Sequence, residues 1–191
     1  MKIGLFFGSF NPIHIGHLVI AGYMTEFTDL DRVWFVVSPH NPLKEKSTLL
    51  ADHHRLQLVQ LSIEDNRKLK ASNIEFKLPQ PSYTIHTLTY LKEKYPTQQF
   101  ALIMGSDNLE TFHKWKNHEQ ILEQYELYVY PRPGFLGGQL KEHPKVKMVK
   151  TPVMELSSSF IRQAVKDKKD VRYMMPEAAY TFMKDMHFYE K

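Results

Sequence analysis

The sequence predicts a doubly wound α/β fold, in which a parallel sheet lies between two layers of helices. Three almost wholly apolar runs without alternation, at 3–7, 32–37 and 100–104, are typical of strands buried on both faces of a sheet. Segments with helical patterns separate these strands, at 18–27, 53–63 and 84–95. Because parallel strands need crossover connections, this alternation of strands and helices favours a parallel sheet.

The remaining elements continue the alternation with weaker signals. Asp52 is expected to cap the helix over 53–63, and the Pro- and Gly-containing stretch 132–144 is expected to be a surface loop. Further strands are predicted at 71–76, 127–130 and 146–149, and further helices at 108–115, 118–125, 158–166 and 176–186. We expect residues 1–191 to form a single domain with a small helical C-terminal part from about residue 157.

Composition excludes several classes of protein. Hydrophobic residues make up 42% of the 191 residues, which is enough for a globular core. The absence of cysteine excludes disulfides, thiolate metal sites and a cysteine nucleophile. The net charge of +4 suits anionic substrates such as nucleotides but is too small and scattered for nucleic-acid binding. No apolar run approaches the ~18 residues of a membrane span, so we expect a cytoplasmic protein; a homo-oligomer is left open.

The loop after the first strand carries the strongest signal, the string G-S-F-N-P-I-H-I-G-H over 8–17. Neither of the two familiar Gly-rich phosphate motifs is present there. Gly8 allows the backbone to approach a ligand closely, and a helix starting near Gly16 would place His14 and His17 at its N-terminus, where backbone N–H groups favour an anion. Taken alone, the histidine pair is also compatible with an incidental turn or with zinc ligation.

The whole string resembles the signature of the nucleotidyltransferase superfamily, whose members carry [HT]-x-G-H after the first strand. The segment 156–162, L-S-S-S-F-I-R, resembles the second motif of that superfamily, I-S-S-T-x-I-R. Both motifs stand in the expected order, each at a predicted strand-to-helix junction. The resemblance implies a Rossmann-like nucleotidyltransferase fold and transfer of the adenylyl group of ATP.

Within the superfamily the chain most resembles the bacterial nicotinate-nucleotide adenylyltransferase family. His14 fits this branch, whereas the phosphopantetheine branch usually has Thr there. The segment 81–88 resembles the family's S-Y-T-x-x-T-L, and 105–115 resembles its G-x-D…W. The segment 39–44 resembles its P-x-x-P-H-K loop, but Leu43 stands where His is usual.

The resemblance implies a role for each matching residue. His14, His17 and Arg162 would stabilise the reacting phosphates of ATP. The other residues expected to bind ATP are Gly8, Ser9, Phe10, Gly16, Lys44, Gly105, Asp107, Ser157 and Ser158. The nicotinate is expected to contact Ser82, Tyr83, Thr84 and Trp115, with the indole as a stacking surface.

Two of these assignments stay open at this point, and the metal comes with the substrate. Asp107 would contact either a ribose or a metal-bound water, and Lys44 either a phosphate or solvent. Mg²⁺ is expected to enter with ATP, bridging phosphates and keeping several waters, without a metal site of the protein's own. ATP and nicotinate mononucleotide are the expected partners.

Three other functions are compatible with parts of the sequence. An enzyme of the same superfamily would use nicotinamide mononucleotide or phosphopantetheine as the acceptor, and Trp115 with 82–84 favours a pyridine nucleotide. A non-catalytic nucleotide-binding module is disfavoured because His14, His17 and Arg162 are all present. A fragment of an aminoacyl-tRNA synthetase is disfavoured by the small size of this chain and by its lack of a K-M-S-K-S-like loop.

Overall fold

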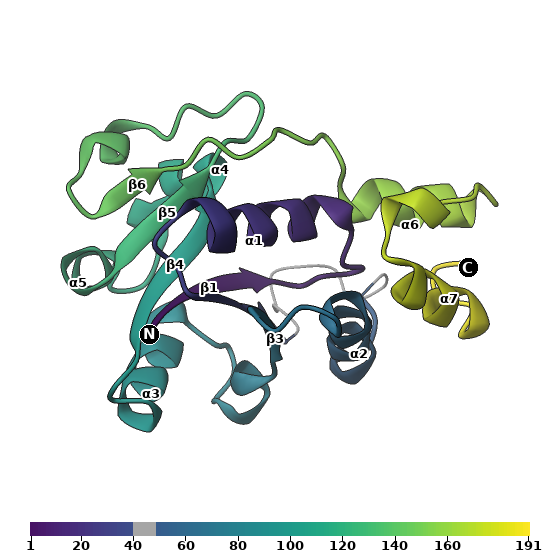
Figure 1. Ribbon diagram of the computed structural model, residues 1–191, viewed down its shortest axis with the longest axis horizontal. Helices are drawn as coiled ribbons and strands as arrows, with labels where there is room; N and C mark the ends of the chain where they lie inside the picture. The colour runs from purple at the N-terminus through teal and green to yellow at the C-terminus, as the bar shows by residue number, and fades with distance from the viewer. Residues whose placement is uncertain (40–48) are drawn as a thin grey trace.

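A six-stranded sheet forms the centre of the protein (Figure 1). The computed structural model describes residues 1–39 and 49–191. The strands are β1 (Lys2–Gly8), β2 (Arg32–Val37), β3 (Leu69–Ser72), β4 (Gln99–Gly105), β5 (Glu126–Tyr130) and β6 (Val146–Met148). They follow the order β3-β2-β1-β4-β5-β6, and every pairing between them is parallel. The predicted doubly wound α/β fold is therefore confirmed.

Helices cover both faces of the sheet. They are α1 (Ile15–Phe27), α2 (Asp52–Ile63), α3 (Thr84–Lys94), α4 (Ser106–Glu110), α5 (His118–Gln124), α6 (Ser158–Lys166) and α7 (Glu177–Asp185). Side chains of α1, α2, α6 and α7 share one core with Phe6 and Phe35 of the sheet. Side chains of α3, α4 and α5 share a second core with Leu5 and Trp34, on the opposite face.

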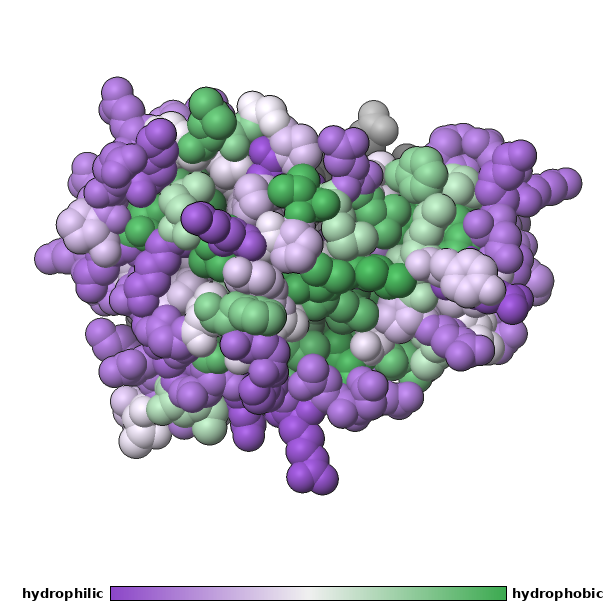
Figure 2. Space-filling view, turned by 45° about the horizontal axis from the view of Figure 1, so that its top comes forward, coloured by the Kyte–Doolittle hydropathy of each residue, from purple (hydrophilic) through white to green (hydrophobic). Residues whose placement is uncertain are grey.

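The sequence of α1 is almost wholly apolar, although only one side of the helix faces the sheet. Ala21 and Met24 are buried in the core, while Leu18, Val19 and Ile20 are half-buried. In the view of Figure 2, apolar residues gather near the middle of the face and hydrophilic residues surround them. None of the helices in the described part of the chain is long and apolar enough to cross a membrane.

Several predicted boundaries were wrong. Asp52 is the first residue of α2 rather than its cap, because Ala51 takes the cap position and Asp52 pairs with Arg55. The strand expected at 71–76 ends at Ser72, and a 3₁₀ turn, η2 (Ile74–Lys77), follows and buries Ile74 and Glu75. These differences arise because burial by distant parts of the chain overrides the local pattern.

Two more predicted elements are divided into shorter ones. The helix expected at 108–115 becomes α4 and a 3₁₀ turn, η3 (Phe112–Lys114), separated by Thr111. The Thr111 hydroxyl donates back to the carbonyls of Asp107 and Asn108, a bond that competes with helix continuation. The loop expected at 132–144 contains the short turn η4 (Gln139–Glu142), and η5 (Arg172–Met174) lies between α6 and α7.

The order of the strands locates the crevice of the fold. From β1 the chain continues outward to β2 and β3, and from β4 it continues in the other direction to β5 and β6. Helices that follow β1 and β4 therefore lie on opposite faces of the sheet, and a crevice opens beyond the carboxyl ends of these two strands. The loop 8–14 and the start of α4 lie at that edge.

Candidate active site

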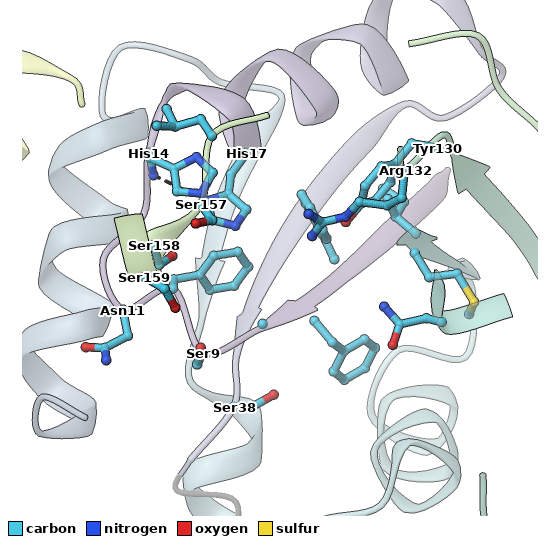
Figure 3. A pocket seen from close by; sticks show the side chains of 18 of the residues that line it. Ser9, Asn11, His14, His17, Ser38, Tyr130, Arg132, Ser157, Ser158 and Ser159 are labelled. Atoms are coloured by element: carbon cyan, nitrogen blue, oxygen red, sulfur yellow. Dashed lines mark hydrogen bonds between the residues drawn. The ribbon is translucent and has the colours of Figure 1, made fainter. Parts of the chain in front are cut away.

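A cleft of about 800 Å³ opens at the carboxyl edge of the sheet (Figure 3). Stretches that are far apart in the sequence line it. The polar ones include the loop after β1 with the start of α1 (Ser9, Asn11, His14, His17), the residue after β2 (Ser38), Asn108 of α4, Arg132 after β5 and the start of α6 (Ser157, Ser158, Ser159, Arg162), and Trp115 adds an aromatic surface. Its wall is therefore rich in hydroxyl, imidazole and guanidinium groups.

Gly8 and Phe10 give the loop after β1 its shape. Phe10 is 2% exposed and packs edge-to-face against Phe6 and Phe35 in the core. Its φ of 44° lies in the left-handed region, which is costly for a residue with a side chain. A Cβ on Gly8 would come within 2.9 Å of the Phe10 ring, so the buried ring requires glycine at that position. Phe10 thus anchors the loop while one side of it lines the cleft.

His14 and His17 lie together at the N-terminus of α1. His14 is the residue before the helix and His17 is its third residue, and their rings stack with centroids 3.8 Å apart. The backbone N–H of His14 donates to Nδ1 of His17 at 3.3 Å, so a neutral His17 carries its proton on Nε2. A Cβ on Gly16 would come within 3.0 Å of Nδ1 of His14, which explains the glycine between the two histidines.

Burial keeps both imidazoles uncharged. It lowers the pKa of His14 to about 4, and the charge of Arg132 adds to that shift. Burial also holds the pKa of His17 well below its usual value, with smaller contributions from His14 and Arg132. Both rings are therefore neutral near pH 7 and can donate an N–H without a proton being bound first.

The N-terminus of α6 holds the loop from the other side. Ser157 caps the helix by accepting from the backbone N–H of Phe160 at 3.1 Å. The hydroxyl of Ser158 donates to the carbonyl of Pro12 at 2.8 Å, and Nη1 of Arg162 donates to the carbonyl of Asn11 at 2.8 Å. The two motifs found in the sequence are thus joined by direct hydrogen bonds.

Arg55 ties the loop to the sheet, and sequence reasoning missed it. It is fully buried on α2 and donates to the carbonyls of Ser9 at 2.6 Å and Ser38 at 2.8 Å. It also forms an ion pair with Asp52 at 2.5 Å. Arg55 therefore joins the carboxyl ends of β1 and β2. Its place within a helical pattern gave no signal of this role, because the carbonyls it reaches are distant in the sequence.

Arg132 is a second residue that sequence reasoning missed. It follows β5, lines the cleft, and places Nε 3.8 Å from Oδ1 of Asp107. A cation two residues after an apolar strand was the available signal, since the carboxyl ends of all parallel strands meet at one edge. Gly105 and Asp107 do not line the cleft themselves. A Cβ on Gly105 would clash with the carboxylate of Asp107 and with Arg132, so the glycine makes room for this pair.

The residues expected to bind nicotinate lie on two segments. Trp115 follows η3 and lines the cleft. Ser82, Tyr83 and Thr84 do not line it, although α3 begins at Thr84 as expected. The ammonium of Lys116 lies 4.4 Å from the ring centroid of Tyr83, which joins the segment 82–84 to the turn that carries Trp115.

Glu75 is a buried carboxyl group behind this second region. Only 3% of it is exposed, and the Thr87 hydroxyl donates to Oε1 at 2.8 Å. Burial raises the pKa of Glu75, and hydrogen bonds with Thr87, Ser38 and Ser82 oppose that rise. Glu75 thus connects Ser38, which lines the cleft, to the segment that contains Ser82.

Lys44 and Leu43, with the rest of the P-x-x-P-H-K-like loop after Pro39, lie outside the described residues. Within the described ranges, no group of three or more His, Cys, Asp or Glu residues is arranged to hold a metal ion. Asp107 reaches the described lining through its pair with Arg132, and Glu75 reaches it through Ser38.

Comparison with known proteins identifies the family. The cytidylyltransferase-like family matches residues 5–164. The chain is 55% identical, over the full length of both chains, to a probable nicotinate-nucleotide adenylyltransferase of Flavobacterium johnsoniae. It is 53% identical to the protein of the same name from Flavobacterium psychrophilum, again over both full lengths.

A solved structure agrees in fold. The nicotinic acid mononucleotide adenylyltransferase of Plasmodium falciparum, solved with NaAD, is 20% identical to this chain with a TM-score of 0.83. The match covers 99% of this chain and 97% of that one. The chain therefore belongs to the cytidylyltransferase-like family and, within it, to the nicotinate-nucleotide adenylyltransferases.

Proposed function

We propose that the chain transfers the adenylyl group of ATP to nicotinate mononucleotide, giving nicotinate adenine dinucleotide and pyrophosphate in NAD biosynthesis. The observation that carries this proposal is the meeting of two features in one cleft. A polar wall built from the two nucleotidyltransferase motifs faces a region that contains Trp115. Two relatives that are more than 50% identical over the full length, both named probable nicotinate-nucleotide adenylyltransferases, support the same reaction.

The chemistry suits a site with neutral histidines. The 5′-phosphate of the mononucleotide attacks the α-phosphorus of ATP, a new P–O bond forms, and the bond to pyrophosphate breaks. A phosphate monoester is already anionic at neutral pH, so the attack needs no general base. Catalysis then consists of positioning and of stabilising the charge that develops on the phosphates.

Three groups of this polar wall would stabilise that charge. Nε2–H of His17 is available as a donor because Nδ1 is occupied by the backbone N–H of His14. The N-terminus of α1 adds the favourable end of a helix dipole. Arg162 would hold the β- and γ-phosphates or the leaving pyrophosphate, with its fork oriented by the carbonyl of Asn11.

Arg132 is suited to the acceptor side of the transfer. It lines the cleft from the end of β5, across from α6, and its charge is felt by both histidines. We assign it a contact with the 5′-phosphate of the mononucleotide. Gly8, Ser9, Gly16, Ser157 and Ser158 would then shape the space around the ATP phosphates.

The donor set fits a metal ion that arrives with the triphosphate. The described lining of the cleft contains no carboxylate, and its histidines are held neutral. Mg²⁺ bound to ATP would supply charge neutralisation there, with phosphates and waters as its ligands. Asp107, which reaches the lining through its pair with Arg132, would contact a ribose or a metal-bound water; its Oδ1 is buried without a hydrogen-bond partner in the described structure.

The acceptor side would select the acid through stacking and hydrogen bonding. The indole of Trp115 offers a flat surface for the pyridine ring. The start of α3 at Thr84 offers N–H donors to the carboxylate, and the ammonium of Lys116 lies beside that segment. A carboxamide would direct its own NH₂ donors at these N–H groups, at a cost of about 1–3 kcal/mol for each mispaired group.

Release of pyrophosphate from ATP with each mononucleotide tests the proposal. We expect kcat/KM for nicotinate mononucleotide to exceed that for the amide by roughly 10²- to 10⁴-fold. Equal values would remove the acid-specific assignment. A preference for phosphopantetheine would exclude a pyridine mononucleotide as the acceptor. ATP binding without turnover would indicate a non-catalytic module.

The proposal extends to the whole chain. Residues 1–191 would act as a single nucleotidyltransferase domain, with the helical part from about residue 157 completing the ATP site through Ser157, Ser158 and Arg162. Lys44, which stands between β2 and α2 in the sequence, would contact the ATP phosphates. We place the enzyme in the cytoplasm, where its ATP is made available.

A further inference from the structure

Tyr189, close to the C-terminal end of the sequence, reaches the loop that follows β1. It lies four residues beyond α7, next to Phe188, whose side chain is buried in the core. The hydroxyl of Tyr189 donates to Oδ1 of Asn11 at 2.6 Å. Burial raises the pKa of Tyr189, so the group stays protonated and able to donate at neutral pH.

Asn11 is an anchoring point of the cleft. It lines the cleft and is 4% exposed. Its Oδ1 accepts from Tyr189 and also from the backbone N–H of Leu50 at 3.2 Å, while its backbone carbonyl accepts from Arg162 at 2.8 Å. An amide oxygen has two lone pairs. Both are in use: the backbone N–H of Leu50, which can only donate, sets which way the amide faces, and the Tyr189 hydroxyl holds its oxygen in place.

The loop needs such anchors because its backbone is costly to hold. Phe10, directly before Asn11, has a positive φ, a conformation that persists only where the surroundings over-determine it. Arg55 holds the carbonyl of Ser9, Arg162 that of Asn11, and Ser158 that of Pro12. These bonds hold the backbone on either side, whereas Tyr189 holds the side chain of Asn11.

We propose that Tyr189 is a positioning residue for the donor phosphates, acting through Asn11 on the loop that carries His14. The tyrosine does not line the described cleft, so it would not touch ATP itself. It would keep Asn11, and with it the carbonyl that orients Arg162, in the arrangement that receives the triphosphate. This inference rests on the proposed function only in taking ATP as the donor nucleotide.

The test compares two tyrosines of the C-terminal part. Tyr189→Phe removes the hydroxyl and keeps the ring beside Phe188. Tyr180→Phe is the matched control, because Tyr180 on α7 also donates one hydroxyl hydrogen bond, to Asp170 at 2.9 Å, away from the cleft. The dissociation constant for ATP with Mg²⁺ is measured by calorimetric titration without acceptor, and the KM values are measured in the complete reaction.

We expect Tyr189→Phe to weaken ATP binding by about 3- to 10-fold, the effect of one lost hydrogen bond of about 1 kcal/mol. KM for the mononucleotide should stay within about 2-fold, which is below half a kcal/mol. Tyr180→Phe should change neither value. In an Asn11→Ala background, which itself weakens ATP binding, Tyr189→Phe should have no further effect, because the acceptor of the bond is gone.

Three outcomes would overturn the inference. They are unchanged ATP affinity in Tyr189→Phe, equal losses in Tyr189→Phe and Tyr180→Phe, and additive losses in the double variant. Should Tyr189→Phe prove too unstable to assay, Asn11→Ala decides, since unchanged ATP affinity there would remove the proposed route. Because ATP binding is measured without acceptor, the inference can stand even where nicotinate mononucleotide proves not to be the acceptor.

Discussion

The two sides of the site, which we propose for the ATP donor and the mononucleotide acceptor, are built in different ways. On the donor side, the side chains of Arg55, Ser158 and Arg162 hold three backbone carbonyls of the loop after β1. On the acceptor side, Trp115 and the segment 82–84 are joined by side-chain contacts, such as that between Lys116 and Tyr83. The exposed ring of Tyr83 contrasts with the 2% exposure of Phe10. The donor side is thus held through its backbone, whereas the acceptor side is held through its side chains.

The two sides also differ in the kind of titratable group that is buried: histidine bases on one side and a carboxylic acid on the other. Burial lowers the pKa of His14 and His17 and raises the pKa of Glu75. In both cases the low-dielectric surroundings favour the neutral form. A drop in pH therefore acts against the fold at the donor histidines, whereas a rise in pH acts against it at Glu75.

The largest effect is expected at His17. His17→Ala should lower kcat by roughly 10²–10³, the range for the loss of one preorganised donor in a charge-stabilising site. The rate of pyrophosphate release at saturating ATP and mononucleotide measures it. His17→Asn, whose Oδ1 can still accept from the backbone N–H of His14, separates lost chemistry from a disturbed helix start. Turnover near the wild-type value in His17→Ala would remove this residue from the mechanism.

Trp115 tests the acceptor side alone. Trp115→Ala should raise KM for nicotinate mononucleotide by roughly 10- to 100-fold, since stacking of a base on an aromatic side chain contributes about 1–3 kcal/mol. ATP affinity should stay unchanged, and the ratio of acid to amide should survive because stacking does not recognise the carboxylate. Trp115→Phe should recover part of the loss. A comparable fall in ATP affinity would contradict the division into two sides.

Arg162 tests whether the shape of the cation matters on the donor side. Arg162→Lys keeps the charge and loses the planar fork that bonds Asn11 and Ser159. We expect ATP binding to weaken by about 1–2 kcal/mol, which calorimetric titration can resolve. ATP affinity that is unchanged in both Arg162→Lys and Arg162→Ala would mean that the helix N-termini alone hold the phosphates.

The smallest effect concerns the response of His14 to pH. In the unfolded chain the imidazole has a pKa near 6.5 and binds a proton as the pH falls, whereas the folded one, with a pKa of about 4, does not. Lowering the pH from 7 to 5.5 should therefore reduce the free energy of unfolding by about 1 kcal/mol through this residue. Urea unfolding of the wild type and of His14→Gln at both pH values measures this change in the free energy of unfolding. Equal pH dependence in the two proteins would mean that the His14 imidazole is exposed to solvent.

The sequence predicted the fold and many residues of the cleft lining because both are recorded locally. Buried strands show as apolar runs, and the motif residues that line the cleft lie directly after strands or at a helix start, as His14 and Ser157 do. The 3₁₀ turns at 74–77 and 112–114 were missed because helix and strand patterns do not describe them. Arg55 and Tyr189 were missed for another reason: their partners lie 46 and 178 residues away, and no local pattern encodes such a pairing.

The parallel pairing of β1 with β4 has a consequence for how the protein folds. Leu5 on β1 lies beside Leu102 on β4, so the centre of the sheet can close only after a loop of nearly half the chain has been brought together. Such long-range pairing slows folding compared with local contacts. The cleft lies at the end of these two strands and takes its last anchors from residues 162 and 189. The loop after β1 is made early during synthesis, but it would thus be among the last segments to reach its final geometry.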